Sequence, residues 1–253
     1  MISLIKLLSE GSKKPKAIFM AGPAGSGKTF IRKKIIPSNF ITLNIDDEYE
    51  ELLKKSGLGL KQQDFDSEKL SQAAKMMSQA QKSTREKFSE LSKQLKDIVI
   101  DGTGAASRPL LKKKDELEAL GYDTFMVLIN VSPITSLKRN TTRDRQLLPS
   151  IIIKTWHGVN TNIDTYKEAF GEDHFALINN DPEDAELGFE EEDVRIYINK
   201  SKAKGKPKTP EQLAKRKAEK EKINIDIKQM VQIERKFDTL EQAKQKIDRF
   251  LNE

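Results

Sequence analysis

The chain has 253 residues, no cysteine and a formal net charge of +6, with 33% charged and 36% hydrophobic residues. The absence of cysteine excludes a disulfide framework, a Cys-ligated metal and a cysteine nucleophile, and it fits a reducing cytosol. No apolar run reaches the ~20 residues of a membrane helix, and the start of the chain is a poor signal peptide, so we expect a cytoplasmic protein without a membrane partner.

Five short apolar runs predict buried strands. They do not alternate with polar residues, which is typical of strands covered on both faces of a sheet. Helical patterns lie between them, and strands that alternate with helices predict an α/β fold with one mostly parallel sheet of about five strands. The predicted strands are Lys16–Ala21, Phe40–Ile45, Ile98–Asp101, Thr124–Val131 and Phe175–Asn179, and the predicted helices are Gly27–Ile36, Ser67–Lys96, Pro109–Leu120 and Pro149–Phe170.

Beyond the last predicted strand the charge is segregated. An acidic segment at 181–193 precedes a strongly basic one at 202–222, which supplies much of the net charge. We interpret the basic segment as a solvated connector, and an arm that binds a polyanion is the alternative.

The C-terminal part is expected to be helical. A peripheral strand is predicted at Val194–Asn199, and the helix Thr239–Leu251 has an apolar face that must pack, most simply on the main domain. We therefore divide the chain into a domain at 1–182, a charged connector at 183–210 and a helical appendage at 211–253, to which a protein partner could bind.

The stretch GPAGSGKT matches the phosphate-binding loop G-x-x-x-x-G-K-[ST], and it lies between a predicted strand and a predicted helix. Glycines let successive N–H groups point at phosphate oxygens, and the helix that begins there adds its positive dipole end. We expect ATP here, with Lys28 at the β- and γ-phosphates and the Thr29 hydroxyl on Mg²⁺. The residues predicted to hold the nucleotide are Gly22, Gly25, Ser26, Gly27, Lys28 and Thr29.

Carboxylates end the second and third predicted strands. Because the carboxyl ends of parallel strands face the ligand crevice, Asp46 or Asp47 should lie near the terminal phosphate. A carboxylate there can accept the proton of an attacking hydroxyl, and capping of the next helix is the alternative. Asp101 would hold magnesium, position the acceptor or form a turn.

Three arginines fall within LKRNTTRDRQLLP, at Arg139, Arg143 and Arg145. Guanidinium groups suit the charge that develops on a transferring phosphoryl group. We expect a mobile lid that closes over ATP and uses these arginines, with Arg145 on the nucleotide. A solvated basic loop is the alternative.

The motifs GPAGSGKT, NIDDEYE, IDGTG and SLKRNTTRDRQLLP resemble, in this order, P-loop kinases of the zeta-toxin and polynucleotide 5′-kinase type. The resemblance covers roughly residues 15–180. It implies that Asp47 is the general base and that Arg139 and Arg143 are lid arginines, with Arg143 in contact with the transition state. The chain also resembles phage-encoded members, which act in the cytoplasm of an infected host.

One position departs from the polynucleotide kinases. There an arginine that binds the acceptor's phosphate follows the base by three residues, whereas this chain has Glu50, which would repel a polyphosphate. We therefore expect Mg²⁺-dependent transfer of the γ-phosphate of ATP to a hydroxyl of a nucleotide or nucleotide-sugar type of small molecule. The alternatives are a polynucleotide 5′-hydroxyl kinase, with nucleic acid as a less favoured partner, and an ATP-binding interaction protein with little catalysis.

Overall fold

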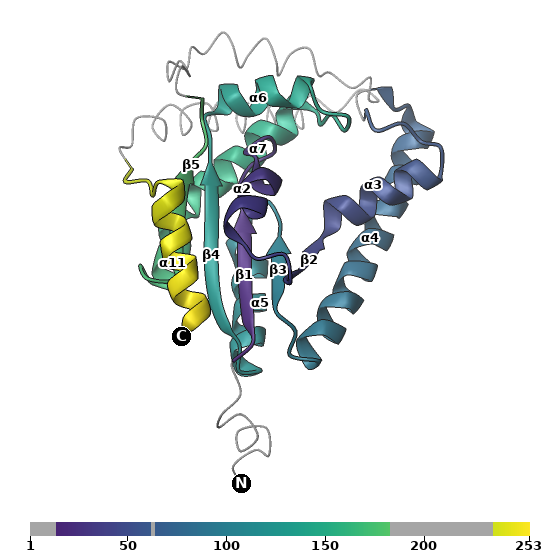
Figure 1. The fold of residues 1–253 in the computed structure, drawn as a ribbon. Helices are drawn as coiled ribbons and strands as arrows, with labels where there is room; N and C mark the ends of the chain where they lie inside the picture. The colour runs from purple at the N-terminus through teal and green to yellow at the C-terminus, as the bar shows by residue number, and fades with distance from the viewer. Residues whose placement is uncertain (1–13, 62–63, 183–234) are drawn as a thin grey trace, which may run out of the picture.

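The structure is a computed structural model that describes residues 14–61, 64–182 and 235–253 (Figure 1). Five parallel strands form one sheet in the order β2-β3-β1-β4-β5, which confirms the predicted α/β fold with a single sheet. The strands are β1 (Lys16–Ala21), β2 (Ile41–Asn44), β3 (Ile98–Asp101), β4 (Asp123–Asn130) and β5 (Phe175–Asn179).

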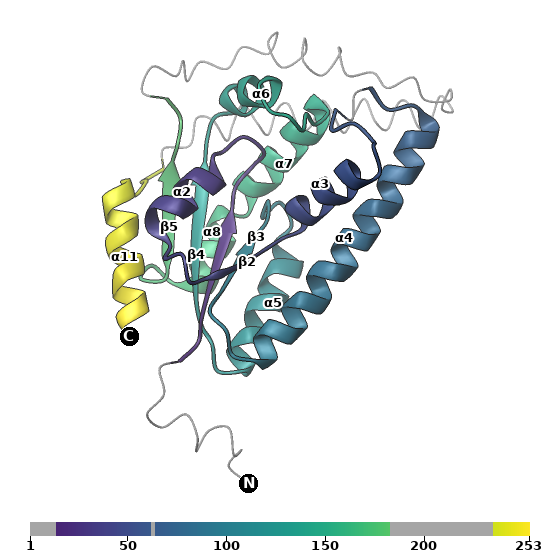
Figure 2. The same cartoon turned by 45° about the vertical axis from the view of Figure 1, so that its right-hand side comes forward.

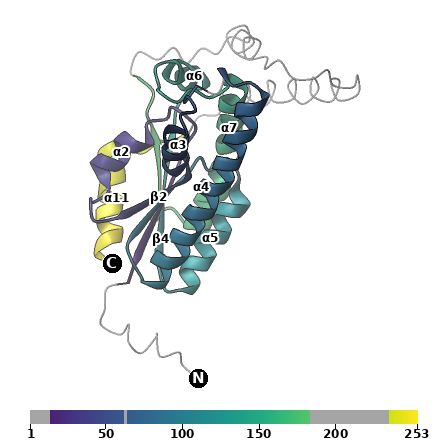
Figure 3. The same cartoon turned by 90° about the vertical axis from the view of Figure 1, so that its right-hand side faces the viewer.

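Helices cover both faces of the sheet (Figures 1 and 2). One face carries α2 and α11, the other carries α5, α7 and α8, and the pair α3–α4 lies beside the edge strand β2. The side view separates the two helical layers (Figure 3). The helices are α2 (Lys28–Ile35), α3 (Ile45–Lys55), α4 (Ser67–Lys93), α5 (Ser107–Ala119), α6 (Pro133–Thr141), α7 (Pro149–Thr161), α8 (Ile163–Phe170) and α11 (Leu240–Asn252).

The central strand β1 explains why the apolar runs do not alternate. All of its residues are buried. Phe19 packs into the core on the α5–α7–α8 side, while Ile18 and Met20 pack into the core beneath α2 and α11. A strand with a core on each face needs apolar residues at every position.

Several predicted boundaries differ from the observed ones, and two of the differences have a visible cause in the structure. The predicted single helix Pro149–Phe170 is two helices, because the chain turns at Asn162, whose side-chain amide donates to the carbonyls of Gly158 and Ala105. The predicted strand Phe40–Ile45 ends at Asn44, because Asn44 caps a helix that begins at the next residue.

Helix α6 was not predicted. Its N-terminus has a Ser132 cap, whose hydroxyl accepts from the Thr135 N–H, and Pro133 in the first turn. The predicted lid therefore begins inside a helix, and Arg139 lies in the last turn of α6.

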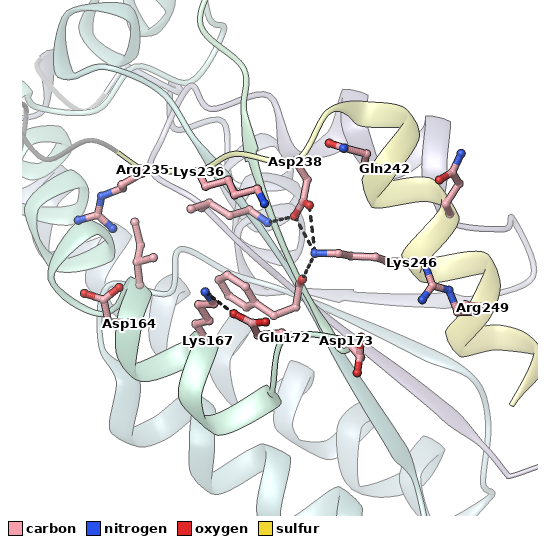
Figure 4. Close-up of a pocket in the computed structure, with 14 residues that line it drawn as sticks. Asp164, Lys167, Glu172, Asp173, Arg235, Lys236, Asp238, Gln242, Lys246 and Arg249 are labelled. Atoms are coloured by element: carbon pink, nitrogen blue, oxygen red, sulfur yellow. Dashed lines mark hydrogen bonds and ion pairs between the residues drawn. The ribbon is translucent and has the colours of Figure 1, made fainter.

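The C-terminal helix α11 is fastened to the edge strand β5 (Figure 4). Its apolar face buries Ala243, Ile247 and Phe250, as the sequence predicts. Lys246 donates to the Phe175 carbonyl at 3.0 Å and pairs with Asp238 at 3.0 Å. Such contacts cover backbone groups that an open strand edge would expose.

Other predictions for the C-terminal part fall outside the described residues. These are the peripheral strand at 194–199 and the basic segment at 202–222, so the limits of the connector and the appendage stay predictions. Within the described parts of the chain, no helix combines the length and the apolar character needed to cross a membrane.

Candidate active site

The phosphate loop follows β1 and leads directly into α2, as the motif predicts. Gly27 has φ +85°, a conformation that favours glycine, and an added Cβ would lie 2.4 Å from the Asn180 Nδ2. A Cβ at Gly22 would lie 2.4 Å from the Ile129 carbonyl oxygen. Glycine is therefore favoured at position 22 by close packing against the backbone of β4, and at position 27 by the positive φ.

Lys28 lies within the loop. Its ammonium donates to the carbonyl of Gly22 at 2.8 Å and to that of Pro23 at 3.4 Å. Burial lowers the pKa of Lys28, the carboxylates Asp101 and Asp46 oppose that effect, and the positive charge of Arg143 adds to it.

Two side chains from other elements brace the loop. Arg139 donates to the Gly25 carbonyl at 3.1 Å and to the Asn180 carbonyl at 2.9 Å. Asn180 in turn donates to the Ser26 carbonyl at 2.8 Å. Asn180 was not among the predicted site residues, and its only sequence signal is a polar residue directly after a buried strand.

The predicted carboxylates meet at the carboxyl ends of β2 and β3. Asn44 lies opposite Asp101 in the sheet, and its amide donates to that carboxylate at 3.3 Å. The Oδ1 of Asn44 accepts a hydrogen bond from the Asp46 N–H at 2.8 Å. The cap of α3 is therefore Asn44, and Asp46 and Asp47 occupy the first helical turn, where the helix dipole favours negative charge.

The acidic groups differ in their surroundings. Burial raises the pKa of Asp47, the negative charge of Asp46 adds to this effect, and Arg32 opposes it. Burial also raises the pKa of Asp101, to about 6, against the attraction of Lys28. Asp101 is 7% exposed, and its Oδ1 has no hydrogen-bond partner among the described residues.

A magnesium ion fits this set of groups. The buried Oδ1 of Asp101 has no hydrogen-bond partner among the described residues, and the exposed Thr29 follows Lys28 in the first turn of α2. Carboxylate and hydroxyl oxygens are hard ligands of the kind that Mg²⁺ takes, together with phosphate oxygens and water.

The three arginines take different places. Arg139 braces the phosphate loop, and the exposed Arg143 lies near enough to Lys28 to lower its pKa. The sequence assigns Arg145 to the nucleotide, whereas the structure buries it against α3, where it pairs with Asp46 at 2.9 Å and with Glu50 at 3.7 Å.

Comparison with known proteins identifies the family. The family model described as Zeta toxin matches residues 4–200, most of the chain. The chain belongs to the zeta toxin family. No curated protein matches the sequence of this zeta toxin family member.

Solved structures share the fold of this zeta toxin family member at low sequence identity. The PezAT toxin–antitoxin system of Streptococcus pneumoniae gives a TM-score of 0.50 at 17% identity, over 88% of this chain and 93% of the other. The AvrRxo1-ORF1:-ORF2 complex gives a TM-score of 0.55 at 14% identity, over 91% of this chain and 84% of the other. The same complex solved with ATP gives a TM-score of 0.51 at 14% identity, over 96% of this chain and 82% of the other. Family and fold together support a P-loop phosphotransferase.

Two cavities lie at opposite edges of the sheet of this family member. One of about 350 Å³ opens between β2, α3 and α4, and its polar lining includes Asp47, Asn44 and Thr42. The other, of about 530 Å³, lies between α8, β5 and α11 (Figure 4). The first cavity adjoins the predicted base Asp47, whereas the second lies at the opposite edge strand, β5.

Proposed function

We propose that this zeta toxin family member transfers the γ-phosphate of ATP to a hydroxyl of a small molecule of nucleotide or nucleotide-sugar type. One observation carries the proposal: the carboxyl ends of β1, β2 and β3 bring together Lys28 in the phosphate loop, the first-turn carboxylate Asp47 and the buried Asp101. In the proposal these three groups serve as the phosphate-binding cation, the general base and a metal ligand.

ATP is the proposed phosphate donor. The loop amides and Lys28 would bind its β- and γ-phosphates, while Arg139 and Asn180 hold the loop in shape through its carbonyls. The fold shared with the AvrRxo1-ORF1:-ORF2 complex solved with ATP supports this assignment.

Thr29 and Asp101 would hold Mg²⁺. When bound, the ion neutralises charge on the β- and γ-phosphate oxygens. Asn44 donates to one oxygen of the Asp101 carboxylate, and the other oxygen has no hydrogen-bond partner in the described part of the chain. The protein's part is thus to present a preoriented carboxylate beside the phosphate loop.

Asp47 is proposed as the general base. The acceptor hydroxyl loses its proton to the Asp47 carboxylate as its oxygen attacks the γ-phosphorus and ADP leaves. Burial raises the pKa of Asp47, which makes the carboxylate a better proton acceptor than an exposed one. Arg143 would neutralise the charge on the transferring group.

The surroundings of Glu50 favour an acceptor without a phosphate next to the attacked hydroxyl. Glu50 occupies the place at which the polynucleotide kinase pattern has an acceptor-binding arginine, and the neighbouring Arg145 already pairs with Glu50 and Asp46. Two carboxylates and one guanidinium leave net negative charge there, which repels an adjacent phosphate.

A protein partner is also proposed. Among the solved structures that share the fold, one belongs to a toxin–antitoxin system and another is a complex of two proteins. Purification of the full chain with proteins encoded beside it, followed by size-exclusion chromatography, would test this part of the proposal.

The test of the function is transfer of label from [γ-³²P]ATP in the presence of Mg²⁺. Separate reactions contain nucleotide sugars and nucleotides, 5′-hydroxyl oligonucleotides, or buffer alone, with the wild type beside Lys28→Met. We expect labelled small molecules with the wild type only. Labelled oligonucleotides would favour the polynucleotide kinase, and ATP binding without any labelled product would favour an interaction protein.

A further inference from the structure

The loop between α6 and α7 is closed on itself. The Asn140 side chain donates to the Leu147 carbonyl at 3.0 Å and accepts from the Leu147 N–H at 2.9 Å. Gln146 donates to the carbonyl of Thr141 at 2.8 Å. These contacts join both ends of the loop that carries Arg143, so its base is fixed to the end of α6.

Arg145 attaches the tip of this loop to α3. Its guanidinium pairs with Asp46 at 2.9 Å and Glu50 at 3.7 Å, and it lies 5.1 Å above the ring of Tyr49. These three partners are spaced i, i+3 and i+4, so they share one face of α3. The Arg145 side chain is 7% exposed, and its Nε is buried without a hydrogen-bond partner among the described residues.

Because Arg145 is buried, breaking its contact with α3 costs free energy. A buried guanidinium needs opposite charges close by, which the two carboxylates supply, and a ring face adds cation–π attraction. If Arg145 swung away to bind a nucleotide, Asp46 and Glu50 would be left as a like-charge pair one turn apart, with Asp47 adjacent. The geometry therefore favours a bridge over a mobile nucleotide ligand.

The bridge joins two elements that the proposed reaction needs together. Helix α3 carries Asp47, while the loop carries Arg143, whose charge lowers the pKa of Lys28 in the phosphate loop. We propose that Arg145 is a positioning residue that holds α3 and the α6–α7 loop together, so that Asp47 and Arg143 act on the same phosphoryl group. This inference rests on the proposed function above.

The test compares Arg145→Gln with wild type in kinetics and in ATP binding. We expect kcat to fall about tenfold to a hundredfold, the effect of losing a charged hydrogen bond, while the Kd of ATP stays within about twofold. In Arg145→Lys the ammonium can pair with one carboxylate but lacks the planar set of donors of a guanidinium. Its kcat should therefore lie between those of Arg145→Gln and wild type. Lys154→Gln, an exposed cation on α7, is the matched charge control and should match wild type.

A double-mutant cycle with Asp46→Asn identifies the partner. If the bridge acts as one unit, Arg145→Gln combined with Asp46→Asn lowers kcat no further than the worse single variant. Additive effects would overturn the inference. So would an ATP Kd that rises as much as kcat/KM falls, since Arg145 would then be a nucleotide ligand, or an unchanged kcat.

Amide hydrogen exchange tests the contact between Arg145 and α3 independently of catalytic activity. The inference predicts faster amide exchange in residues 141–148 and at the start of α3 for Arg145→Gln, and wild-type exchange for Lys154→Gln. Unchanged exchange would overturn the bridge even if the wild type transfers phosphate. Conversely, a wild type that labels no acceptor refutes the proposed function, while faster exchange still supports the contact itself.

Discussion

Asp47 is the residue on which the proposed chemistry depends. It acts as a base only when ionised, so kcat/KM must fall as the pH drops through its pKa. Burial and the charges of Asp46, Glu51 and Glu48 raise that pKa, and Arg32 lowers it. The acid limb of the pH profile should therefore lie above the usual range of an aspartate.

Removal of Arg32 should shift that limb. In Arg32→Gln the charge that stabilises the Asp47 carboxylate is lost, so the acid limb of kcat/KM should move to higher pH than in wild type. A pH–rate profile at saturating Mg²⁺ measures the shift. An acid limb that stays in place, or moves to lower pH, would contradict the assignment of this limb to Asp47.

Asp101 is a buried carboxylate with one oxygen left unpaired by the described residues. Such a group stabilises a bound cation at the expense of the metal-free fold. In buffer with EDTA at pH 8, Asp101→Asn should raise the free energy of unfolding by about 1 kcal/mol, or Tm by about 2–4 °C. Differential scanning calorimetry measures the Tm of both proteins. A lower Tm for Asp101→Asn would show that the protein compensates the charge of Asp101 without a metal ion.

At the scale of elements, α11 belongs to the core. Phe250 is fully buried, its ring lies 5.2 Å from that of Phe125, and the Lys16 ammonium lies 4.6 Å from its centre. Phe250→Ala should therefore lower the free energy of unfolding by about 3–5 kcal/mol. Urea denaturation measures the loss, with the exposed Lys244→Ala on the same helix as control. A loss similar to that of the control would show that α11 folds independently.

The elements that sequence could predict are those with a local signal. The strands are continuous apolar runs, and the phosphate loop has a fixed pattern of glycines. The break at Asn162 has no glycine or proline, and its cause is a hydrogen bond to Ala105, 57 residues away. Helix α6 has a cap and a proline, but its basic residues made a loop the simpler interpretation.

The sequence predicts the candidate site as a list of residues but not as a set of contacts. Arg139 meets Gly25 across 114 residues, and Arg145 meets Asp46 across 99. Both partners are set by the packing of α6 and the following loop on the sheet, which periodicity does not encode. The assignment of Arg145 to the nucleotide followed from its neighbours in sequence, whereas its neighbours in space are acidic.

At the scale of the molecule, nucleotide binding should stabilise the whole fold. A ligand that binds only the folded state at a hundred times its Kd adds about 2.7 kcal/mol, so Mg²⁺-ATP should raise Tm by roughly 5–10 °C. AMP, which lacks the β- and γ-phosphates, should raise it less. A thermal shift assay measures both, and an equal shift in Lys28→Met would place the nucleotide elsewhere.

The most direct test of the whole account is single-turnover phosphate transfer by Asp47→Asn. The acceptor is the one that the labelling experiment identifies, and the exposed Asp115→Asn on α5 is the control. We expect Asp47→Asn to bind ATP within about twofold of wild type but to transfer phosphate about 10²–10⁴ times more slowly. Transfer at the wild-type rate would contradict it, because the acceptor hydroxyl would then lose its proton to another group.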